Sequence, residues 1–193
     1  MNEGKTVTAC RENRYNMLIR ESGGIVMADR TGVIFLAGGC FWGLQKFFDQ
    51  FDGVTGTEVG YANGPAWAPT YQDVCGNSGH AETVKIEYDE TRMPLEKLLD
   101  YYFMVIDPLS VNRQGHDEGI QYRTGIYYTD ERQKQTVTEV YHREEEKAGQ
   151  KLAVAVEPLQ NFFSAEEYHQ KYLEKNPGGY CHIPAGYYTL GKK

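Results

Sequence analysis

The sequence predicts a mixed α/β sandwich in which helices pack on a sheet. Short apolar runs bounded by glycines or turns alternate with segments whose apolar residues recur at helical spacing. The chain has 193 residues, enough for one domain with its own core and short for two. Hydrophobic residues make up 40% and charged residues 24%, which is typical of a globular protein rather than a disordered chain.

Each predicted element follows from a local pattern. Apolar runs rich in branched residues predict buried strands, and apolar residues three and four apart predict helices that glycine or proline ends. In the strand 81–88, the alternation places Glu82 on the same face as Val84, Ile86 and Tyr88. The elements expected are strands at 31–37, 54–61, 81–88, 122–128 and 152–157, and helices at 41–53, 70–74, 94–106, 130–149 and 164–175.

Three other segments lack a periodic pattern. Residues 1–30 contain arginine and glutamate throughout and no continuous apolar core, so we interpret them as a poorly defined N-terminal extension and not as a signal peptide. Residues 111–121 predict a polar loop, and the residues 176–193, rich in glycine and proline, predict coil. The domain that carries the function is therefore expected at 31–193.

Charge and hydropathy exclude two classes of partner. The 20 basic and 27 acidic residues give a net charge of −7, which makes non-specific nucleic-acid binding a poor hypothesis. The uncharged run that contains residues 32–45 is too short to span a bilayer. We expect neither a nucleic acid nor a membrane as partner.

The four cysteines are Cys10, Cys40, Cys75 and Cys181. No two of them form a C-x-x-C pair, so no metal site is expected, and four are too few for a disulfide scaffold. Five methionines and the absence of a secretory pattern favour a reducing cytoplasm. A cysteine in such a protein is usually a small buried hydrophobe, and we keep this interpretation for Cys10 and Cys75.

Cys40 has a different local context. It lies where the first predicted strand turns through Gly38-Gly39 into a helix. The unpaired N–H groups and the dipole at a helix start favour the thiolate, which is the reactive form of cysteine. Phe41 and Trp42 follow, and either they belong to the core or they form an aromatic wall beside a nucleophilic Cys40.

Two further residues could act with Cys40. Glu82 leads an apolar strand face, where burial would raise its pKa and make it a general acid, unless the start of the strand is solvated. Cys181 lies in the C-terminal coil, either as a mobile resolving thiol or as an inert one in a docked tail. His182 beside it either favours the Cys181 thiolate or is a surface residue.

Two reactive cysteines fit peroxide reduction, sulfoxide reduction or a phosphatase. A cysteine phosphatase needs an arginine six residues after the nucleophile, where this chain has Lys46. An aromatic wall suits a thioether methyl group better than a phosphate dianion. A thiol peroxidase and a redox-sensing, methionine-binding module remain as alternatives to a sulfoxide reductase.

Motifs in order from about residue 33 to residue 183 resemble those of the peptide methionine sulfoxide reductase A (MsrA) family. Each is weak alone, and together they are highly specific. They are Gly39-Cys40-Phe41-Trp42-Gly43, Gly60-Tyr61-Ala62, Pro69-Thr70-Tyr71, Gly79-His80-Ala81-Glu82, Asp107-Pro108, Arg113-Gln114-Gly115, Asp117, Gln121-Tyr122-Arg123 and Asn176-Pro177-Gly178-Gly179-Tyr180-Cys181.

The resemblance implies a fold and a set of roles. The implied fold is α+β, a two-layer α/β sandwich with a mixed sheet, a ferredoxin-like core and a long coiled C-terminal tail. The implied roles are nucleophile for Cys40, methyl-group pocket for Phe41 and Trp42, binding and protonation of the sulfoxide oxygen for Glu82, Tyr71 and Tyr122, a further pocket residue in Asp117, and resolving cysteine in Cys181.

The resemblance also implies the reaction. The substrate is methionine sulfoxide, free or in proteins, of the S epimer, and the reductant is thioredoxin. No cofactor is expected. Some family members carry another cysteine beyond the position of Cys181, but residues 185–189 have none. The expected relay therefore runs in one step from Cys40 to Cys181.

Overall fold

The computed structural model describes residues 17–19, 25–27 and 30–191. Residues 1–30 and 31–193 form two compact units, which are described separately. In the first unit, β1 (Met17–Ile19) pairs antiparallel with β2 (Ile25–Met27), and the sequence did not predict either strand. Cys10 lies outside the described residues.

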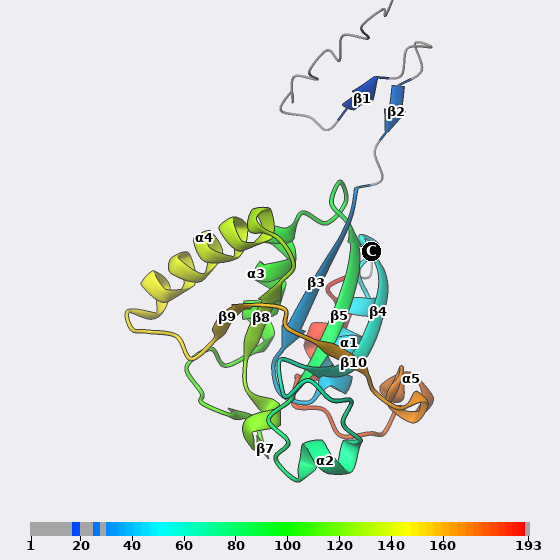
Figure 1. Ribbon diagram of the computed structural model, residues 1–193, viewed down its shortest axis with the longest axis vertical. Coiled ribbons are helices and arrows are strands. Elements are labelled where there is room, and N and C mark those ends of the chain that lie inside the picture. Colours follow the sequence, from blue (N-terminus) through cyan, green and yellow to red (C-terminus); the bar gives the residue numbers. More distant parts are fainter. Residues whose placement is uncertain (1–16, 20–24, 28–29, 192–193) are drawn as a thin grey trace, which may run out of the picture. The chain divides into compact units, whose positions relative to one another are not determined.

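The second unit is built on a six-stranded sheet in the order β10-β4-β5-β3-β8-β9 (Figure 1). Neighbouring strands run antiparallel except β8 and β9, which run parallel, so the sheet is mixed. The bounds are β3 (Thr31–Ala37), β4 (Val54–Ala62), β5 (Ala81–Asp89), β8 (Gly125–Tyr128), β9 (Ala155–Pro158), β10 (Phe162–Ser164), α1 (Phe41–Asp49), α2 (Tyr71–Cys75), α3 (Leu95–Val105), α4 (Glu131–Ala148) and α5 (Tyr172–Lys175). The predicted mixed α+β class is confirmed.

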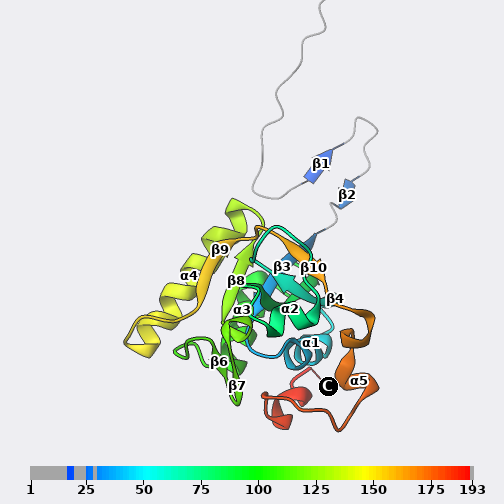
Figure 2. The ribbon, with the colours of Figure 1, turned by 60° about the horizontal axis from the view of Figure 1, so that its bottom comes forward.

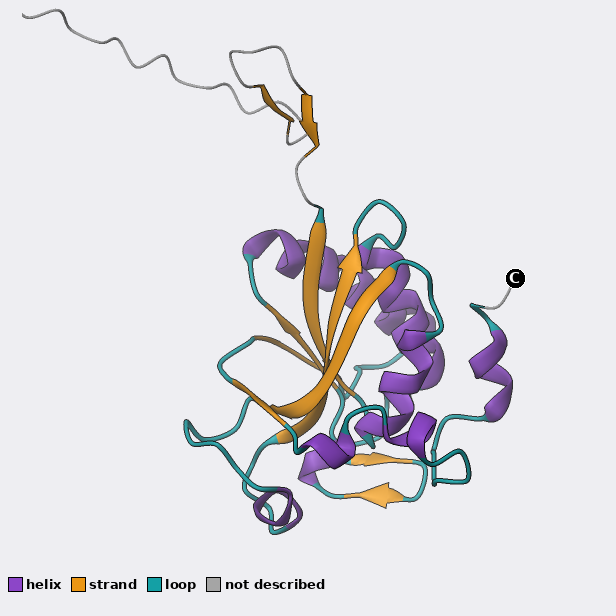
Figure 3. Cartoon of the chain, turned by 90° about the vertical axis from the view of Figure 1, so that its right-hand side faces the viewer, coloured by secondary structure: helices purple, strands orange, loops and turns teal. Residues whose placement is uncertain are grey.

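The main core lies between the sheet and the helices α1, α3 and α4. Figure 3 shows the larger helices gathered on one side of the strands. In β3, Ile34 and Leu36 face these helices, whereas Phe35 and Ala37 join a smaller cluster on the other face. Both faces of β3 are therefore buried, as expected for a strand predicted from a continuous apolar run.

The ends of α4 show why its bounds were predictable. The side chain of Asp130 accepts a hydrogen bond from the backbone N–H of Gln133 at 2.8 Å, which caps the first turn. Gly149 ends the helix with φ +66°, a conformation that glycine adopts without strain. The Asp130 cap and Gly149 each lie next to the helix end that they determine, so the local sequence was enough to predict both bounds.

Segment 111–121 is not a plain polar loop. It contains the two-stranded pair β6 (Arg113–Gln114) and β7 (Asp117–Glu118), followed by a 3₁₀ turn at Ile120–Tyr122. Tyr122 therefore precedes β8, which begins at Gly125, instead of opening that strand. The carbonyl of Tyr122 accepts a hydrogen bond from the N–H of Gly39 at 3.3 Å, and this long-range contact holds it beside the turn that precedes Cys40.

The helix predicted at 164–175 is wrong. Ser164 ends β10, a 3₁₀ turn covers Glu167–His169, and only α5 is helical. The side chain of Gln170 pairs with the edge of β4, where it accepts from the N–H of Val59 at 3.0 Å and donates to the carbonyl of Val59 at 2.9 Å. These tertiary hydrogen bonds replace those that a continuous helix would make.

The C-terminal segment runs beside α1 (Figure 2). Residues 176–184 form no helix or strand, and a 3₁₀ turn follows at Ala185–Thr189, where the sequence predicted coil throughout. Within the described ranges, no helix is long and apolar enough to cross a membrane.

Candidate functional site

Strand pairing brings Cys40 and Glu82 to the same end of the sheet. Ala37, at the end of β3, pairs with Thr83 near the start of β5. Because the two strands are antiparallel, the residue before Thr83, Glu82, lies beside the turn that leads to Cys40. The carboxylate oxygen Oε2 of Glu82 accepts a hydrogen bond from the backbone N–H of Phe41 at 3.0 Å. The first turn of α1 is thereby joined to β5 next to the thiol.

Gly39 makes this turn possible. Its φ is +76°, a left-handed conformation that favours glycine. A Cβ atom at Gly39 would also lie 2.6 Å from the Cβ of Gln114, so the turn packs directly against β6. Gly38-Gly39 therefore serves a geometric purpose beyond ending the strand.

Glu82 is 2% exposed, so of the two alternatives that the sequence left open, the buried one holds. Burial is the main cause that raises its pKa to about 8, and the charge of Asp117 adds to the shift. The hydrogen bond from the Phe41 N–H opposes it and is outweighed. Glu82 is therefore mostly a neutral carboxylic acid at pH 7 and has a proton to give.

Cys40 occupies the N-cap position of α1 and is 7% exposed. Burial and then the charge of Glu82 raise the pKa of this thiol well above its usual value, whereas the backbone N–H of Trp42 lowers it. The N–H groups at the helix start favour the thiolate, as the sequence predicted, but the net shift of the Cys40 pKa in the structure is upward. Desolvation of the charged form is larger than the contribution of the helix.

The two aromatic residues after Cys40 differ in burial. Phe41 is 1% exposed and belongs to the main core, with its ring 5.9 Å from that of Tyr61. Trp42 is half-buried, stacks on Tyr172 at 3.8 Å and donates its indole N–H to Nδ1 of His169 at 3.1 Å. Phe41 thus fits the core interpretation, and Trp42 fits a wall that a ligand could reach.

Three further predicted site residues interact electrostatically with Glu82, namely Tyr71, Tyr122 and Asp117. Tyr71 begins α2, and Tyr122 ends the 3₁₀ turn before β8. Burial and the charge of Glu82 raise the pKa of both phenols, so they keep their protons and can donate hydrogen bonds. The charge of Asp117, in β7, raises the pKa of Glu82 and of Tyr122, and burial raises the pKa of the Asp117 carboxyl itself.

Cys181 lies against the first turns of α1. A Cβ atom at Gly43 would be 2.8 Å from the Sγ atom of Cys181, which shows how closely the two segments pack. The hydroxyl of Tyr188 contacts the same sulfur. Cys40 and Cys181 are both free thiols.

Cys75 and His182 differ from what the sequence suggested. Cys75, interpreted as buried, is exposed at the end of α2, where its side chain hydrogen-bonds that of Tyr71. The His182 side chain is only 3% exposed and lies 4.0 Å from Asp117, so it is not a surface residue. Burial lowers the pKa of His182 to about 4, so the neutral ring offers the Cys181 thiolate no positive charge.

The sequence missed Glu166 and His169. The Glu166 carboxylate accepts hydrogen bonds from the backbone N–H of Tyr71 at 2.9 Å and from the Tyr61 hydroxyl at 2.8 Å. His169 is 1% exposed and receives the indole N–H of Trp42. An acid and a histidine three residues apart in a presumed helix are typical of a solvated face, so no local signal separated them from surface residues.

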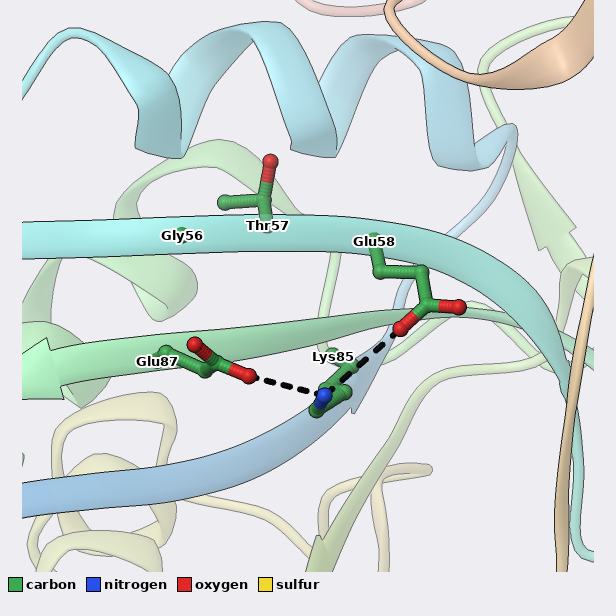
Figure 4. A pocket seen from close by; sticks show the side chains of 5 residues that line it. All are labelled: Gly56, Thr57, Glu58, Lys85 and Glu87. Atoms are coloured by element: carbon green, nitrogen blue, oxygen red, sulfur yellow. Dashed lines mark ion pairs between the residues drawn. The ribbon is translucent and has the colours of Figure 1, made fainter. Parts of the chain in front are cut away.

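A polar hollow lies along β4 and β5, away from Cys40, and is lined by Gly56, Thr57, Glu58, Lys85 and Glu87 (Figure 4). Lys85 forms ion pairs with Glu87 at 2.8 Å and Glu58 at 3.6 Å, so its charge is already matched within the hollow. Across residues 30–191, no group of three or more histidine, cysteine or acidic side chains is arranged to hold a metal ion.

A mixed α+β fold with two free thiols and a neutral carboxylic acid at one end of its sheet is typical of a thiol-dependent oxidoreductase. Comparison with known proteins makes this specific. The family model described as peptide methionine sulfoxide reductase matches residues 32–189. The chain belongs to the peptide methionine sulfoxide reductase family, and the predicted resemblance is confirmed.

Individual relatives agree with this assignment. The chain is 57% identical over 152 residues to the peptide methionine sulfoxide reductase MsrA of Clostridium acetobutylicum, covering 78% of this chain and 94% of that protein. Among solved structures, reduced Mxr1 from Saccharomyces cerevisiae superposes with a TM-score of 0.76 at 32% identity, covering 88% of this chain and 96% of that one. Methionine sulfoxide reductase A of Corynebacterium diphtheriae gives a TM-score of 0.73 at 34% identity, covering 80% and 84%.

Proposed function

We propose that the chain reduces the S epimer of methionine sulfoxide, free or in proteins, with Cys40 as nucleophile and Glu82 as acid. The observation that carries these roles is the junction of Cys40 and Glu82 through the Phe41 N–H, with the carboxyl pKa near 8. Tyr71 and Tyr122 hold the sulfoxide oxygen. Trp42 and Asp117 border the substrate, and Phe41 forms the buried part of the pocket, continuous with the core.

The first step transfers oxygen from the substrate to the enzyme. The sulfur of a sulfoxide is electropositive, and the Cys40 sulfur attacks it while Glu82 protonates the departing oxygen. The attack forms a bond between the two sulfurs while the sulfur–oxygen bond of the substrate breaks. The oxygen, released as water, then bonds to the Cys40 sulfur and returns a proton to Glu82, as the sulfur–sulfur bond breaks and its electron pair leaves with methionine. Cys40 is thereby oxidised by two electrons to a sulfenic acid. Proton donors placed at the oxygen stabilise the charge that develops there.

The second step restores the thiol. The Cys181 sulfur attacks the sulfenic acid, water leaves, and a Cys40–Cys181 disulfide forms. Thioredoxin, the dithiol reductant that the family resemblance implies, then exchanges with this disulfide and becomes oxidised. The position of Cys181 against Gly43 supports a one-step relay, and Mxr1 has been solved in complex with Trx2. Catalysis by free thiols also favours a reducing compartment such as the cytoplasm.

We further propose that the core is ferredoxin-like, with a C-terminal tail that carries the resolving thiol. The support is the order β3-α1-β4-β5-α3-β8, which holds when the short elements α2, β6, β7 and the 3₁₀ turn between them are left out. Its four strands lie side by side as β4-β5-β3-β8 with antiparallel neighbours. Residues 176–184, without helix or strand, support the tail.

Turnover of a racemic methyl aryl sulfoxide with dithiothreitol tests the function. We expect one enantiomer to be consumed, with equimolar formation of the sulfide, and chiral chromatography measures this loss. Cys40→Ser should abolish turnover with any reductant, whereas Cys75→Ser, which changes an exposed thiol outside the relay, should keep it. If neither enantiomer were consumed, the proposal would be contradicted. Consumption of peroxide instead of sulfoxide would identify a thiol peroxidase.

A further inference from the structure

His169 connects two elements that carry proposed pocket residues. Its Nδ1 accepts the indole N–H of Trp42, which lies on α1, at 3.1 Å. Its ring centroid lies 4.6 Å from that of Tyr71 on α2 and 5.2 Å from that of Phe41. With 1% of the residue exposed, this imidazole is packed among the side chains that would surround the substrate.

The hydrogen bond from Trp42 determines the tautomer of His169. Because Nδ1 accepts, a neutral ring must carry its proton on Nε2. Nε2 has no hydrogen-bond partner among the described residues, and the nearest carboxylate oxygen, of Glu166, is 4.0 Å away. Burial lowers the pKa of His169, so Nδ1 stays free to accept at neutral pH.

The indole of Trp42 is held at two points. One face stacks on Tyr172 with an interplanar angle of 14°, and the N–H edge bonds to His169. Stacking alone allows an aromatic ring to slide and to turn in its plane, whereas a hydrogen bond to a fixed acceptor prevents both. The acceptor is fixed because His169 is buried.

We propose that His169 is a positioning residue for sulfoxide reduction, whose Nδ1 sets the orientation of the Trp42 indole against the substrate methyl group. The inference rests on the proposed function, since it takes Trp42 as the wall of the pocket. His169 touches no reacting atom and acts through Trp42. Its loss should therefore weaken substrate binding more than it slows the chemical step.

The test uses the full chain with Trp67→Phe, which leaves Trp42 as the single tryptophan. His169→Asn places an amide oxygen near the position of Nδ1, whereas His169→Gln places its polar atoms near Nε2 and leaves the indole N–H unpaired. Steady-state kinetics give KM and kcat for the sulfoxide. The ¹⁵N-labelled indole N–H resonance of Trp42 reports the hydrogen bond without turnover.

We expect His169→Gln to raise KM about tenfold while kcat changes less than about threefold, since one buried donor loses its acceptor. His169→Asn should restore KM to within about threefold and keep the indole resonance near its original shift, which His169→Gln should move. In a Trp42→Phe background, His169→Gln should add less than about a twofold effect, because the donor is already gone. Trp42→Phe also tests the bond from the other side if His169→Gln does not fold.

Equal KM values for His169→Gln and His169→Asn would overturn the proposal, because a packing role does not distinguish the two amides. An unmoved indole resonance in His169→Gln, or a full effect of His169→Gln in Trp42→Phe, would overturn it as well. Absence of sulfoxide turnover in the unsubstituted protein would overturn the proposed function and this role with it. The indole resonance would then still show whether the hydrogen bond exists, so the two failures are distinguishable.

Discussion

Glu82 combines a structural cost with a chemical use. Its carboxyl accepts one backbone hydrogen bond and is itself almost completely buried, so desolvation keeps it protonated up to about pH 8. A carboxylic acid with a pKa near the working pH is an efficient proton donor. Besides burial, the charge of Glu82 raises the pKa of Cys40, so thiolate formation there is easier when Glu82 is neutral than when it is charged.

The first prediction concerns the acid. Glu82→Gln removes the transferable proton and should lower the rate of methionine formation by about 10²–10⁴-fold in single-turnover assays. In the unsubstituted protein this rate should fall as pH rises through about 8, where Glu82 ionises. A rate in Glu82→Gln close to that of the unsubstituted protein would remove Glu82 from the chemistry.

The second prediction concerns stability. The pKa of Glu82 is raised from its usual 4.5 to about 8 on folding, so the folded state binds the proton more tightly than the unfolded chain. The stability that this proton contributes is present below about pH 4.5 and is lost as pH rises toward 8. Glu82→Gln should therefore increase the free energy of unfolding at pH 8 relative to the unsubstituted protein, and less so at pH 5. Thermal unfolding at the two pH values measures this difference.

The third prediction concerns the resolving thiol. Cys181→Ser should release one equivalent of methionine per chain and then stop with thioredoxin as reductant, because the sulfenic acid on Cys40 has no internal partner. Rapid quench followed by product analysis measures the burst. Continued cycling of this variant with thioredoxin would show that another route reduces Cys40.

At the scale of elements, α1 is the part of the fold that collects the site. Cys40 and Trp42 lie at its start, and the backbone N–H of Phe41 there donates to Glu82 of β5. Cys181 of the C-terminal segment packs against its first turn at Gly43. Gly43 is central to this arrangement because it has no side chain where the Cys181 sulfur lies.

The fourth prediction follows from that contact. Gly43→Ala places a Cβ atom 2.8 Å from the Cys181 Sγ, so the sulfur must move away from α1. Disulfide formation should slow about tenfold or more, because a displaced sulfur loses the geometry of attack, while the first methionine burst keeps its rate. Gly186→Ala is the matched control, since a Cβ there meets no atom within 4 Å. Equal disulfide rates in the two variants would contradict the docking of Cys181 on α1.

The elements that sequence predicted well are those with local causes. The strand at 31–37, the helix after Cys40 and the capped α4 follow from apolar spacing and from terminal residues within a few positions. The helix predicted at 164–175 is wrong because the Gln170 side chain bonds to Val59 of β4, more than 100 positions away. The prediction that Tyr122 opens a strand was wrong for the same kind of reason, since a long-range hydrogen bond from Gly39 holds Tyr122 outside β8.

At the scale of the molecule, the proposed reaction uses only the unit formed by residues 31–193. The family model begins at residue 32, and the described helices and the six-stranded sheet belong to this unit. Residues 1–30 form a separate compact unit.

The fifth prediction is that deletion of residues 1–30 leaves kcat/KM for methionine sulfoxide within about twofold, because the site residues that we propose all lie within residues 31–193. Thermal unfolding should also stay within a few degrees, since the main core is formed by residues of the second unit. A large loss of activity with an intact fold would show that the N-terminal unit contributes to the site.

The sequence by itself determined the family, the α+β class and the residues of the proposed relay, because those depend on residue types in a fixed local order. Tertiary structure alone decided the protonation states of Cys40 and Glu82, since desolvation depends on what surrounds a group. It also decided where Cys181 lies and which residue holds Trp42. The Trp42–His169 hydrogen bond joins positions 127 apart in the chain, and a contact that folding creates over such a separation has no local pattern to predict it.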